Sequence, residues 1–231
     1  MLQLLLCSDV HTFTDNIRLA LKKAGRVDAV LAAGDTEAEM DSILTAAGTV
    51  PLYIVCGNSD YYLNSDYPEE LLIDISIKQS ADTQKPSDPV IEKITELHYS
   101  DMPETVFSLS PHIKNSLPSF FIRKLIKEKR PPHILHRILM THGKEYNVPD
   151  TGLLCARADL WDADIVIFGH THKFTEMICR RGFKRFRFIN PGCLIGNPKN
   201  SPSVLAGCDI CCFALLEIGP EGEINVRKMT L

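Results

Sequence analysis

The chain has 231 residues, of which 45% are hydrophobic and 23% are charged. This composition is ordinary for a globular protein and excludes a chain that is disordered throughout. The length suits one α/β domain, or one domain with a modest insertion. The formal net charge of −4 gives no electrostatic reason to expect nucleic acid as a bulk partner, so that partner class is disfavoured.

The chain begins with the apolar run Leu2–Cys7, which passes directly into Ser8 and Asp9. The run has no basic segment before it and is too short for a signal peptide or a membrane span, so it predicts a buried first strand. No other stretch approaches the length of a span. We therefore expect a soluble, cytoplasmic protein without a membrane partner.

Eight cysteines are scattered through the sequence. Because no export signal is evident, we interpret them as reduced thiols that serve as small apolar fillers. The cluster Cys208, Cys211 and Cys212 admits a second interpretation as a soft-metal site. It lacks the second Cys-x-x-Cys pair or the spaced histidines that such a site needs, so simple thiols are favoured.

Apolar strand-like runs alternate with helical stretches in the first part of the chain. Helical periodicity around Ile17–Leu21 predicts a helix with Asp15 as its N-cap and Gly25 at its end. The alternation favours a parallel sheet covered by helices, which is the α/β class. The predicted strands are Leu2–Cys7, Ala29–Ala33 and Leu52–Cys56, and the second predicted helix is Ala38–Ala47, closed by Gly48.

The alternation breaks between about residues 61 and 136. The part from Lys78 to Pro89 is polar, and further prolines punctuate short mixed segments. Phe120–Lys129 predicts an amphipathic helix whose basic face we interpret as solvated rather than as a phosphate-binding patch. We predict a single domain over 1–231 with an insertion at about 61–136. A cap over the site is the favoured role, with an assembly element or surface decoration as alternatives.

The sheet pattern resumes after this middle segment. We predict strands at Arg137–Thr141 and Asp164–Phe168, with a helix at Leu153–Asp159 between them. A hairpin follows, with apolar segments near Phe174–Cys179 and Phe186–Ile189 on either side of a turn. The last predicted strands are Cys211–Ile218 and Glu223–Met229.

Each predicted core strand ends beside an aspartate, an asparagine or a histidine. The carboxyl ends of parallel strands face one crevice, so these side chains are expected to converge there. Singly, a histidine at a strand end is more often an ordinary polar residue, and an aspartate or asparagine before a helix is more often a cap. Together, five such strand ends favour one shared site. The candidate ligands are Asp9, His11, Asp35, Asn58, His142, His170 and His172.

Two carboxylates, four imidazoles and one amide suit intermediate divalent cations such as Mn²⁺, Fe²⁺, Co²⁺ or Zn²⁺ better than Mg²⁺ or Ca²⁺. Seven side chains are too many for one tetrahedral ion and suit two ions that share a carboxylate. Such a pair lowers the pKa of a bridging water, binds phosphoryl oxygens and offsets the charge that develops in an in-line displacement. Glycines beside these residues, such as Gly34 and Gly57, allow close approach of an anion to the backbone.

Five short motifs carry a resemblance to a known family: Asp9-Val10-His11, Gly34-Asp35, Gly57-Asn58, Thr141-His142-Gly143 and Gly169-His170-Thr171-His172. Their order and spacing resemble those of the calcineurin-like metallophosphoesterases. Three further segments are similar to signatures of the small bacterial and archaeal phosphodiesterase branch: Thr141–Val148, Asp162–His172 and Ile189–Cys193. The resemblance covers about residues 1–60 and 136–231 and leaves the middle segment outside it.

The resemblance implies a four-layer α/β/β/α sandwich, with two sheets between helices. It also implies that Asp9, His11, Asp35 and His172 hold one ion, that Asp35 bridges, and that Asn58, His142 and His170 hold the other. Mn²⁺ is the favoured ion, with Fe²⁺, Co²⁺, Ni²⁺ and Zn²⁺ as alternatives. The implied reaction is hydrolysis of phosphate diesters, or of reactive monoesters, by a metal-bridging hydroxide. Asp35, Asn58 and His142 would position this nucleophile and the phosphate.

The sequence departs from the family pattern in three places. Ser59 stands where the wider superfamily often has a histidine that protonates the leaving alcohol and where the narrower branch often has cysteine. No evident general acid remains, so substrates with good leaving groups are favoured. Thr36 follows Gly34-Asp35 without the Asp-Arg of the phosphoprotein phosphatases, which counts against protein phosphatase activity. The insertion at about 61–136 is also longer than the branch needs.

We expect a small phosphate ester as the substrate and leave a homo-oligomer open. A catalytically weak binding scaffold on the same fold, like the retromer subunit that resembles this family, is the alternative from another class, and the complete ligand set counts against it. A nuclease is a second alternative, which the acidic balance and the lack of a basic aromatic groove disfavour. Insertion residues that could reach the substrate are His98, His112, Lys114 and Arg123, although a surface role is favoured for each.

Overall fold

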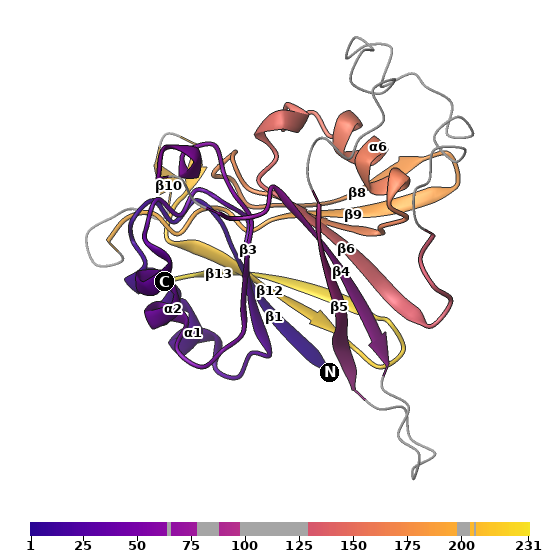
Figure 1. The fold of residues 1–231 in the computed structure, drawn as a ribbon, viewed down its shortest axis with the longest axis horizontal. Helices are drawn as coiled ribbons and strands as arrows, with labels where there is room; N and C mark the ends of the chain where they lie inside the picture. Colours follow the sequence, from indigo (N-terminus) through magenta and orange to yellow (C-terminus); the bar gives the residue numbers. More distant parts are fainter. Residues whose placement is uncertain (64–65, 78–87, 98–128, 198–203, 206) are drawn as a thin grey trace.

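The structure, a computed structural model, describes residues 1–63, 66–77, 88–97, 129–197, 204–205 and 207–231. Almost all of the helix predicted at Phe120–Lys129 lies outside the described residues, as do the insertion candidates His98, His112, Lys114 and Arg123. Two β-sheets pack against each other, and the helices lie on the outer sides of this pair (Figure 1).

The first sheet has five strands in the order β13-β12-β1-β2-β3. β1 (Leu2–Cys7), β2 (Ala29–Ala32) and β3 (Leu52–Ile54) run parallel, and their continuous apolar sequence is typical of strands covered on both faces. On the other side of β1, β12 (Cys212–Ile218) pairs antiparallel with it, and β13 (Ile224–Thr230) forms the edge. All five strands were predicted from the sequence.

Two helices follow the first two strands, α1 (Asp15–Ala24) and α2 (Met40–Ala47). The predicted N-cap of α1 is wrong, because Thr14 occupies the cap position without a side-chain hydrogen bond and Asp15 lies in the first turn. The predicted helix ends are confirmed. Gly25 and Gly48 have φ angles of 80° and 66°, and their amides bond to carbonyls of the last turn, a conformation that glycine adopts at no steric cost.

The second sheet has six strands in the order β5-β4-β6-β7-β9-β8. β6 (Ile134–Thr141), β7 (Ile165–Ile167) and β9 (Lys184–Asn190) run parallel, and β8 (Thr175–Arg181) forms the predicted hairpin with β9. α6 (Gly152–Leu160) precedes β7 and packs on this sheet. The shorter elements are η1 (Asp60–Leu63), η3 (Lys144–Tyr146), β10 (Val204–Leu205) and β11 (Cys208–Asp209).

Two strands of the second sheet lie inside the segment predicted as an insertion at 61–136. β4 (Glu70–Ile77) pairs antiparallel with β6 and β5 (Pro89–Leu97) pairs antiparallel with β4. Seven of the eight residues of β4 are buried, so this part of the segment belongs to the core. Residues 78–87 and 98–128 of the predicted insertion lie outside the described residues, so its role as a cap stays a prediction.

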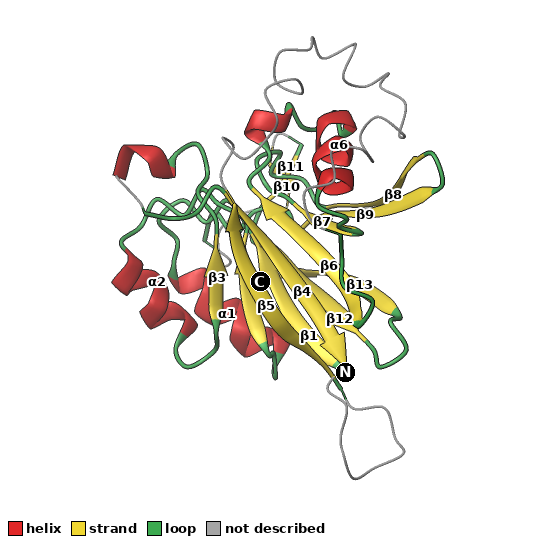
Figure 2. Cartoon of the chain, turned by 45° about the vertical axis from the view of Figure 1, so that its right-hand side comes forward, coloured by secondary structure: helices red, strands yellow, loops and turns green. Residues whose placement is uncertain are grey.

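Three apolar clusters pack between the sheets and helices that Figure 2 shows. One contains residues of both sheets, such as Leu6, Ile73 and Ile167, and fills the space between them. A second joins the first sheet to α1 and α2, and the third joins the second sheet to α6. This arrangement confirms the predicted four-layer α/β/β/α sandwich.

Two buried arginine–carboxylate pairs lie on the second sheet. Arg137 on β6 donates to both carboxylate oxygens of Asp74, its register partner on β4, over 2.6 and 2.9 Å. Arg157 on α6 donates to Glu70 over 2.8 Å, and the hydroxyl of Tyr146 donates to the other oxygen of the same carboxylate over 2.5 Å. These pairs tie β4 to β6, α6 and η3. Within the described ranges, no helix has the length and apolar character needed to cross a membrane.

Candidate metal centre

The candidate ligands all lie in loops that follow parallel strands. The loops after β1, β2 and β3 belong to the first sheet, and the loops after β6 and β7 belong to the second. The first set supplies Asp9, His11, Asp35 and Asn58, and the second supplies His142, His170 and His172. The site is thus shared between the two sheets, at the carboxyl ends of their parallel strands.

Asp9, His11 and His172 form one group whose ligand atoms all lie within 4.8 Å of one another. The Nε2 atoms of the two histidines are 3.4 Å apart, and Nε2 of His172 lies 3.1 Å from Oδ1 of Asp9. The loops after β1 and β7 are held together at this point, since the amide of His170 donates to Oδ2 of Asp9 over 3.1 Å. Three of the four residues that the resemblance assigns to one ion are therefore in contact.

Asp9, Asp35 and His142 form a second group within the same limit. Nε2 of His142 lies 3.3 Å from Oδ2 of Asp35 and 3.2 Å from Oδ1 of Asn58. The carboxylate common to both groups is Asp9, whereas the resemblance assigns the bridge to Asp35, so the bridging role of Asp35 stays a prediction. His170 belongs to neither group, but its ring packs edge-on against His142 with 5.2 Å between centroids.

The backbone at these ligands is unusual. Asp9, His11, Asp35, His170 and His172 have positive φ angles between 43° and 66°. Residues other than glycine seldom adopt this left-handed region, because it costs steric energy, and the exceptions concentrate at functional sites. Five of the seven candidate ligands share the feature, which no sequence pattern had indicated. The chain turns sharply after each strand, and this brings the side chains toward one point.

Close packing of two loops explains two of the glycines. A Cβ atom at Gly57 would lie 2.1 Å from Oδ1 of Asp35, and one at Gly34 would lie 2.8 Å from the amide nitrogen of Gly57. Neither position therefore admits a larger residue without moving a candidate ligand. The structure thus gives these glycines a role in the packing between loops, whereas their predicted role in the approach of an anion stays a prediction.

Asp60 fixes the same two loops and was missed in the sequence analysis. Its buried carboxylate accepts hydrogen bonds from the amides of Thr36, Glu37 and Gly57 and from the Thr36 hydroxyl, over 2.8 to 3.0 Å. The available signal was an acidic residue two positions after Asn58. Ser59 adds to the arrangement, since its amide donates to Asp35 over 2.8 Å and its hydroxyl lies 3.2 Å from the same carboxylate.

Glu37 is a second residue that the sequence analysis missed. Its Oε1 lies 2.9 Å from Nδ1 of His11, on the side of the ring opposite the group formed with Asp9 and His172. The residue has a φ of 47°, so it shares the left-handed conformation of the candidate ligands. No sequence signal distinguished Glu37 from the neighbouring acidic residue Glu39.

Opposite charges perturb the proton affinities of the buried residues. Burial alone would lower the pKa of His142, but hydrogen bonding to Asp35 and the charges of Asp9 and Asp35 raise it to about 9. Burial would raise the pKa of Asp35, yet His142 and the Ser59 amide lower it to about 2. The pKa of His172 is raised, chiefly by its interaction with Asp9, and that of His170 is lowered by burial and by His142.

The donor set fits a divalent metal ion on an independent observation. Oδ1 of Asp9 is a buried carboxylate oxygen that accepts no well-aligned hydrogen bond from the described residues, although Nε2 of His172 lies 3.1 Å from it. Such an orphaned charged atom is costly and signals a missing partner, for which a cation is a suitable candidate. Oxygen and imidazole ligands together suit Mn²⁺, Fe²⁺, Co²⁺, Ni²⁺ or Zn²⁺.

Comparison with known proteins decides the family. The sequence model of the calcineurin-like phosphoesterase superfamily domain matches residues 2–211. The chain belongs to this superfamily. The match includes all seven candidate ligands and also spans the middle segment that the predicted resemblance had left outside.

Solved structures resemble this phosphoesterase domain in fold. A conserved protein from Streptococcus pneumoniae TIGR4, described as a predicted phosphoesterase, has 17% identity and a TM-score of 0.51, covering 100% of this chain and 98% of its own. Vacuolar protein sorting 29 from Cryptosporidium parvum has 17% identity and a TM-score of 0.50, covering 99% and 96%. Its counterpart from Chaetomium thermophilum has 14% identity and a TM-score of 0.50, covering 99% and 94%. No curated protein sequence matches the chain.

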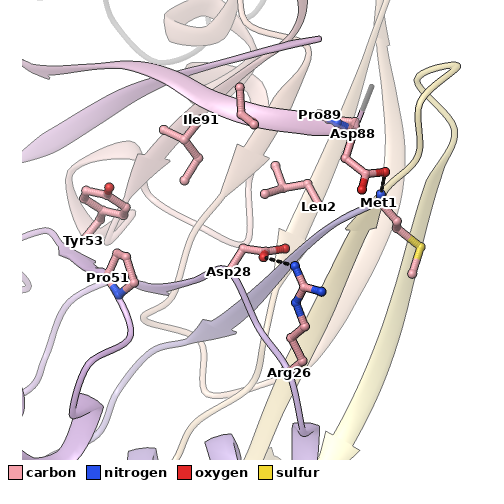
Figure 3. A pocket seen from close by; sticks show the side chains of 10 residues that line it. Met1, Leu2, Arg26, Asp28, Pro51, Tyr53, Asp88, Pro89 and Ile91 are labelled. Carbon is pink, nitrogen blue, oxygen red and sulfur yellow. Dashed lines mark hydrogen bonds and ion pairs between the residues drawn. The ribbon is translucent and has the colours of Figure 1, made fainter. Parts of the chain in front are cut away.

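Two pockets of the phosphoesterase domain lie away from the candidate ligands. One, of about 290 Å³, is lined by Leu2, Asp28 and Pro51, which stand at or before the amino ends of β1, β2 and β3 (Figure 3). The other, of about 760 Å³, lies along the edge strands β3 and β5. The metal centre lies at the carboxyl ends of the strands, so neither pocket belongs to it.

The cysteine cluster of the tail does not form a metal group. Within the described residues, the two groups with metal-ligand geometry contain only aspartate and histidine. Cys211 and Cys212 are buried, and all eight cysteines are free thiols. Cys208 is partly buried, and simple thiols stay our interpretation of the three residues.

Proposed function

We propose that this chain is a binuclear metal-dependent phosphoric ester hydrolase that prefers phosphate diesters to monoesters. The observation that carries the proposal is the convergence of four strand-end loops on two ligand groups that share Asp9, with Asn58 of a fifth loop 3.2 Å from Nε2 of His142. The family membership supports phosphoester chemistry. Preference for diesters rests on the resemblance of the closing motifs to the phosphodiesterase branch.

The chemistry that two divalent ions supply in such a site is polarisation of phosphoryl oxygens and activation of water. We assign Asp9, His11, Asp35 and His172 to one ion and Asn58, His142 and His170 to the other, with Mn²⁺ as the favoured metal. The loop contacts made by Asp60 and Ser59 hold the ligands in place before substrate binds, so little reorganisation is needed during the reaction.

Asp35, Asn58 and His142 are the residues that we assign to positioning the nucleophile and the phosphate. Oδ1 of Asn58 and Oδ2 of Asp35 both lie within 3.3 Å of Nε2 of His142, so the three side chains surround one small volume. The Ser59 hydroxyl lies 3.2 Å from the Asp35 carboxylate. A serine hydroxyl is a poor acid, so we expect turnover to depend strongly on the stability of the leaving group.

Hydrolysis of bis-p-nitrophenyl phosphate tests the proposal. Protein stripped of metal and reconstituted with Mn²⁺, Co²⁺ or Ni²⁺ is expected to release p-nitrophenol. Asp35→Asn is expected to reduce the rate by more than about 100-fold. Residues that only hydrogen-bond to a metal ligand typically contribute about 10- to 100-fold, and loss of a ligand itself should cost more. Asp41→Asn makes the same change at an exposed position of α2 and should leave the rate unaltered.

Absence of turnover with all three metals, or equal rates for the wild type and Asp35→Asn, would refute the enzymatic proposal. A binding scaffold on the same fold is the alternative. Metal binding without turnover would favour it. Digestion of single-stranded DNA under the conditions that support turnover would instead favour a nuclease.

The proposal also covers the cellular compartment and the oligomeric state of the protein. We propose a cytoplasmic protein that acts on a small phosphate ester. Eight free thiols support a reducing compartment, where disulfides seldom persist. Sedimentation velocity would distinguish a monomer from a homo-oligomer.

A further inference from the structure

Glu37 and His11 form a contact that fixes the protonation pattern of the imidazole. Nδ1 of His11 lies 2.9 Å from Oε1 of Glu37. An ionised carboxylate only accepts hydrogen bonds, so the ring nitrogen facing it must carry the proton. In the neutral ring, the other nitrogen then has a free lone pair. That nitrogen, Nε2, lies 3.4 Å from Nε2 of His172, inside the first ligand group.

The position of Glu37 is built rather than incidental. Its φ of 47° is in the region that side-chain-bearing residues avoid. Its amide is held in that conformation by a 2.9 Å hydrogen bond to Asp60, the residue that also fastens the loops of Asp35 and Asn58. The backbone is therefore restrained at a cost, and the result is a carboxylate placed beside His11.

The other candidate histidines lack this arrangement in the described part of the chain. Nδ1 of His142 lies 2.8 Å from the carbonyl oxygen of Ala33, a neutral acceptor. For His170 and His172, no described residue accepts a hydrogen bond from Nδ1. His11 is thus the one candidate histidine with a described carboxylate partner on the side away from its ligand group. A charged acceptor strengthens the hydrogen bond and increases the electron donation of the opposite nitrogen.

We propose that Glu37 is a positioning residue that holds His11 in its Nδ1-protonated tautomer and aims Nε2 into the metal subsite shared with Asp9 and His172. The inference rests on the proposed metal centre and adds a residue to it. Glu37 itself belongs to neither of the two ligand groups, and it touches the first only at Nδ1 of His11, the ring nitrogen that faces away from Asp9 and His172. Its effect therefore passes through His11, both on ring orientation and on ligand strength.

The tautomer can be measured in the metal-free protein. Long-range ¹⁵N–¹H correlation spectra at about pH 8.5, roughly two units above the ordinary imidazole pKa of about 6.5, distinguish the two ring nitrogens. The wild type is expected to show His11 protonated at Nδ1. Glu37→Ala is expected to show a mixture or the opposite tautomer, because water replaces the carboxylate. Glu37→Gln should largely keep the Nδ1 proton, since its amide oxygen still accepts.

Metal affinity provides the second readout, by competition with a chromogenic chelator for Mn²⁺ or Co²⁺. Loss of a residue that orients a histidine ligand typically weakens binding about 10- to 100-fold, which is the expectation for Glu37→Ala. Glu37→Gln should lie between that variant and the wild type, because it keeps the acceptor and loses the charge. Glu39→Ala and Glu39→Gln make the same changes at an exposed residue and should bind within about twofold of the wild type.

A wild-type His11 protonated at Nε2 would overturn the proposal. So would Glu37 variants that bind metal as tightly as the Glu39 controls. Loss of one bound ion in Glu37→Ala with an unchanged His11 tautomer would make Glu37 a ligand in its own right and also overturn a positioning role. If Glu37→Ala failed to fold, the same two measurements on Glu37→Gln would decide. A wild type that binds no metal would refute the proposed function. The tautomer measurement would still show whether Glu37 holds the proton on Nδ1 of His11.

Discussion

His142 lies fully buried between two carboxylates, and its charge couples the metal-free site to pH. Its folded-state pKa of about 9 lies above the ordinary value of 6.5. A group with a raised pKa contributes stability that is complete below its unfolded pKa and is lost as the pH rises through the folded value. The window for His142 is therefore about pH 6.5 to 9.

We predict that the free energy of unfolding of the metal-free protein falls between pH 6.5 and 9. The slope for one proton cannot exceed about 1.4 kcal/mol per pH unit. His136 and His172 also have raised pKa values, so both add to the slope above pH 6.5. Asp35, with its pKa lowered to about 2, loses its contribution only in acid and does not interfere.

Urea unfolding in the presence of a chelator, repeated across this pH range, measures the slope. His142→Asn should flatten it clearly, because the asparagine cannot titrate. An unchanged slope in this variant would mean that His142 does not carry its proton in the folded, metal-free protein.

The sequence indicates which residues are candidate ligands better than it indicates which other residues contact them. The sequence indicates His142 and Asp9 as candidate ligands, because each follows an apolar strand within two residues and has a side chain of a metal-ligand type. The contact of Glu37 with His11 could not be predicted from the sequence. It depends on a left-handed turn and on a hydrogen bond to Asp60, and no local sequence pattern encodes either of them.

Among the elements, the strands covered on both faces were the easiest to predict. β1 and β2 are almost wholly apolar runs, and a short run of that kind in a globular protein is most readily explained as a buried strand. β4 and β5 were assigned to an insertion because a polar segment with prolines separates them and obscures the pattern. Their place in the core depends on pairing with β6, more than fifty residues from β4 in sequence, and such pairing is not visible locally.

The buried pair of Arg157 and Glu70 links α6 to β4, and substitutions of its two residues show how much this link stabilises the fold. Removing one partner of a buried pair leaves an uncompensated charge and typically costs about 3–5 kcal/mol, so Arg157→Met should lower the free energy of unfolding by that amount. Adding Glu70→Gln removes the stranded charge and keeps an acceptor for Tyr146. The double variant should recover more than half of the loss.

Urea denaturation of the two single variants and the double variant completes a thermodynamic cycle. Additive losses, with the double variant less stable than either single one, would show that the two side chains do not act as a pair. Equal dependence on urea concentration in all variants would confirm that the same unfolding transition is compared.

At the scale of the whole molecule, the candidate metal centre lies between loops of the two sheets. Four candidate ligands follow strands of the first sheet and three follow strands of the second. A bound ion is therefore expected to stabilise the contact between the sheets and not only a local loop. The four-layer arrangement could be inferred from the resemblance, whereas composition and periodicity alone indicated no more than one parallel sheet.

Metal binding should accordingly raise the melting temperature. Ligand at about 100 times its Kd stabilises a folded protein by roughly 2.7 kcal/mol, which corresponds to about 5–10 °C for a chain of this size. Differential scanning calorimetry with and without Mn²⁺ measures the shift, and Asp35→Asn should lose most of it. An equal shift in that variant would place the stabilising ion elsewhere.

The pairing of β1 with β12 has a consequence for how the protein is made. Leu2 lies opposite Ile218, so β1 takes its antiparallel partner from a segment that is synthesised more than 200 residues later. Until that partner is synthesised, one edge of an almost wholly apolar strand has no neighbour, and exposed edges of this kind invite aggregation. The loops of Asp9 and Asp35 are therefore expected to settle only after β12 has been synthesised, and a nascent chain stalled before Cys212 would be a client for chaperones.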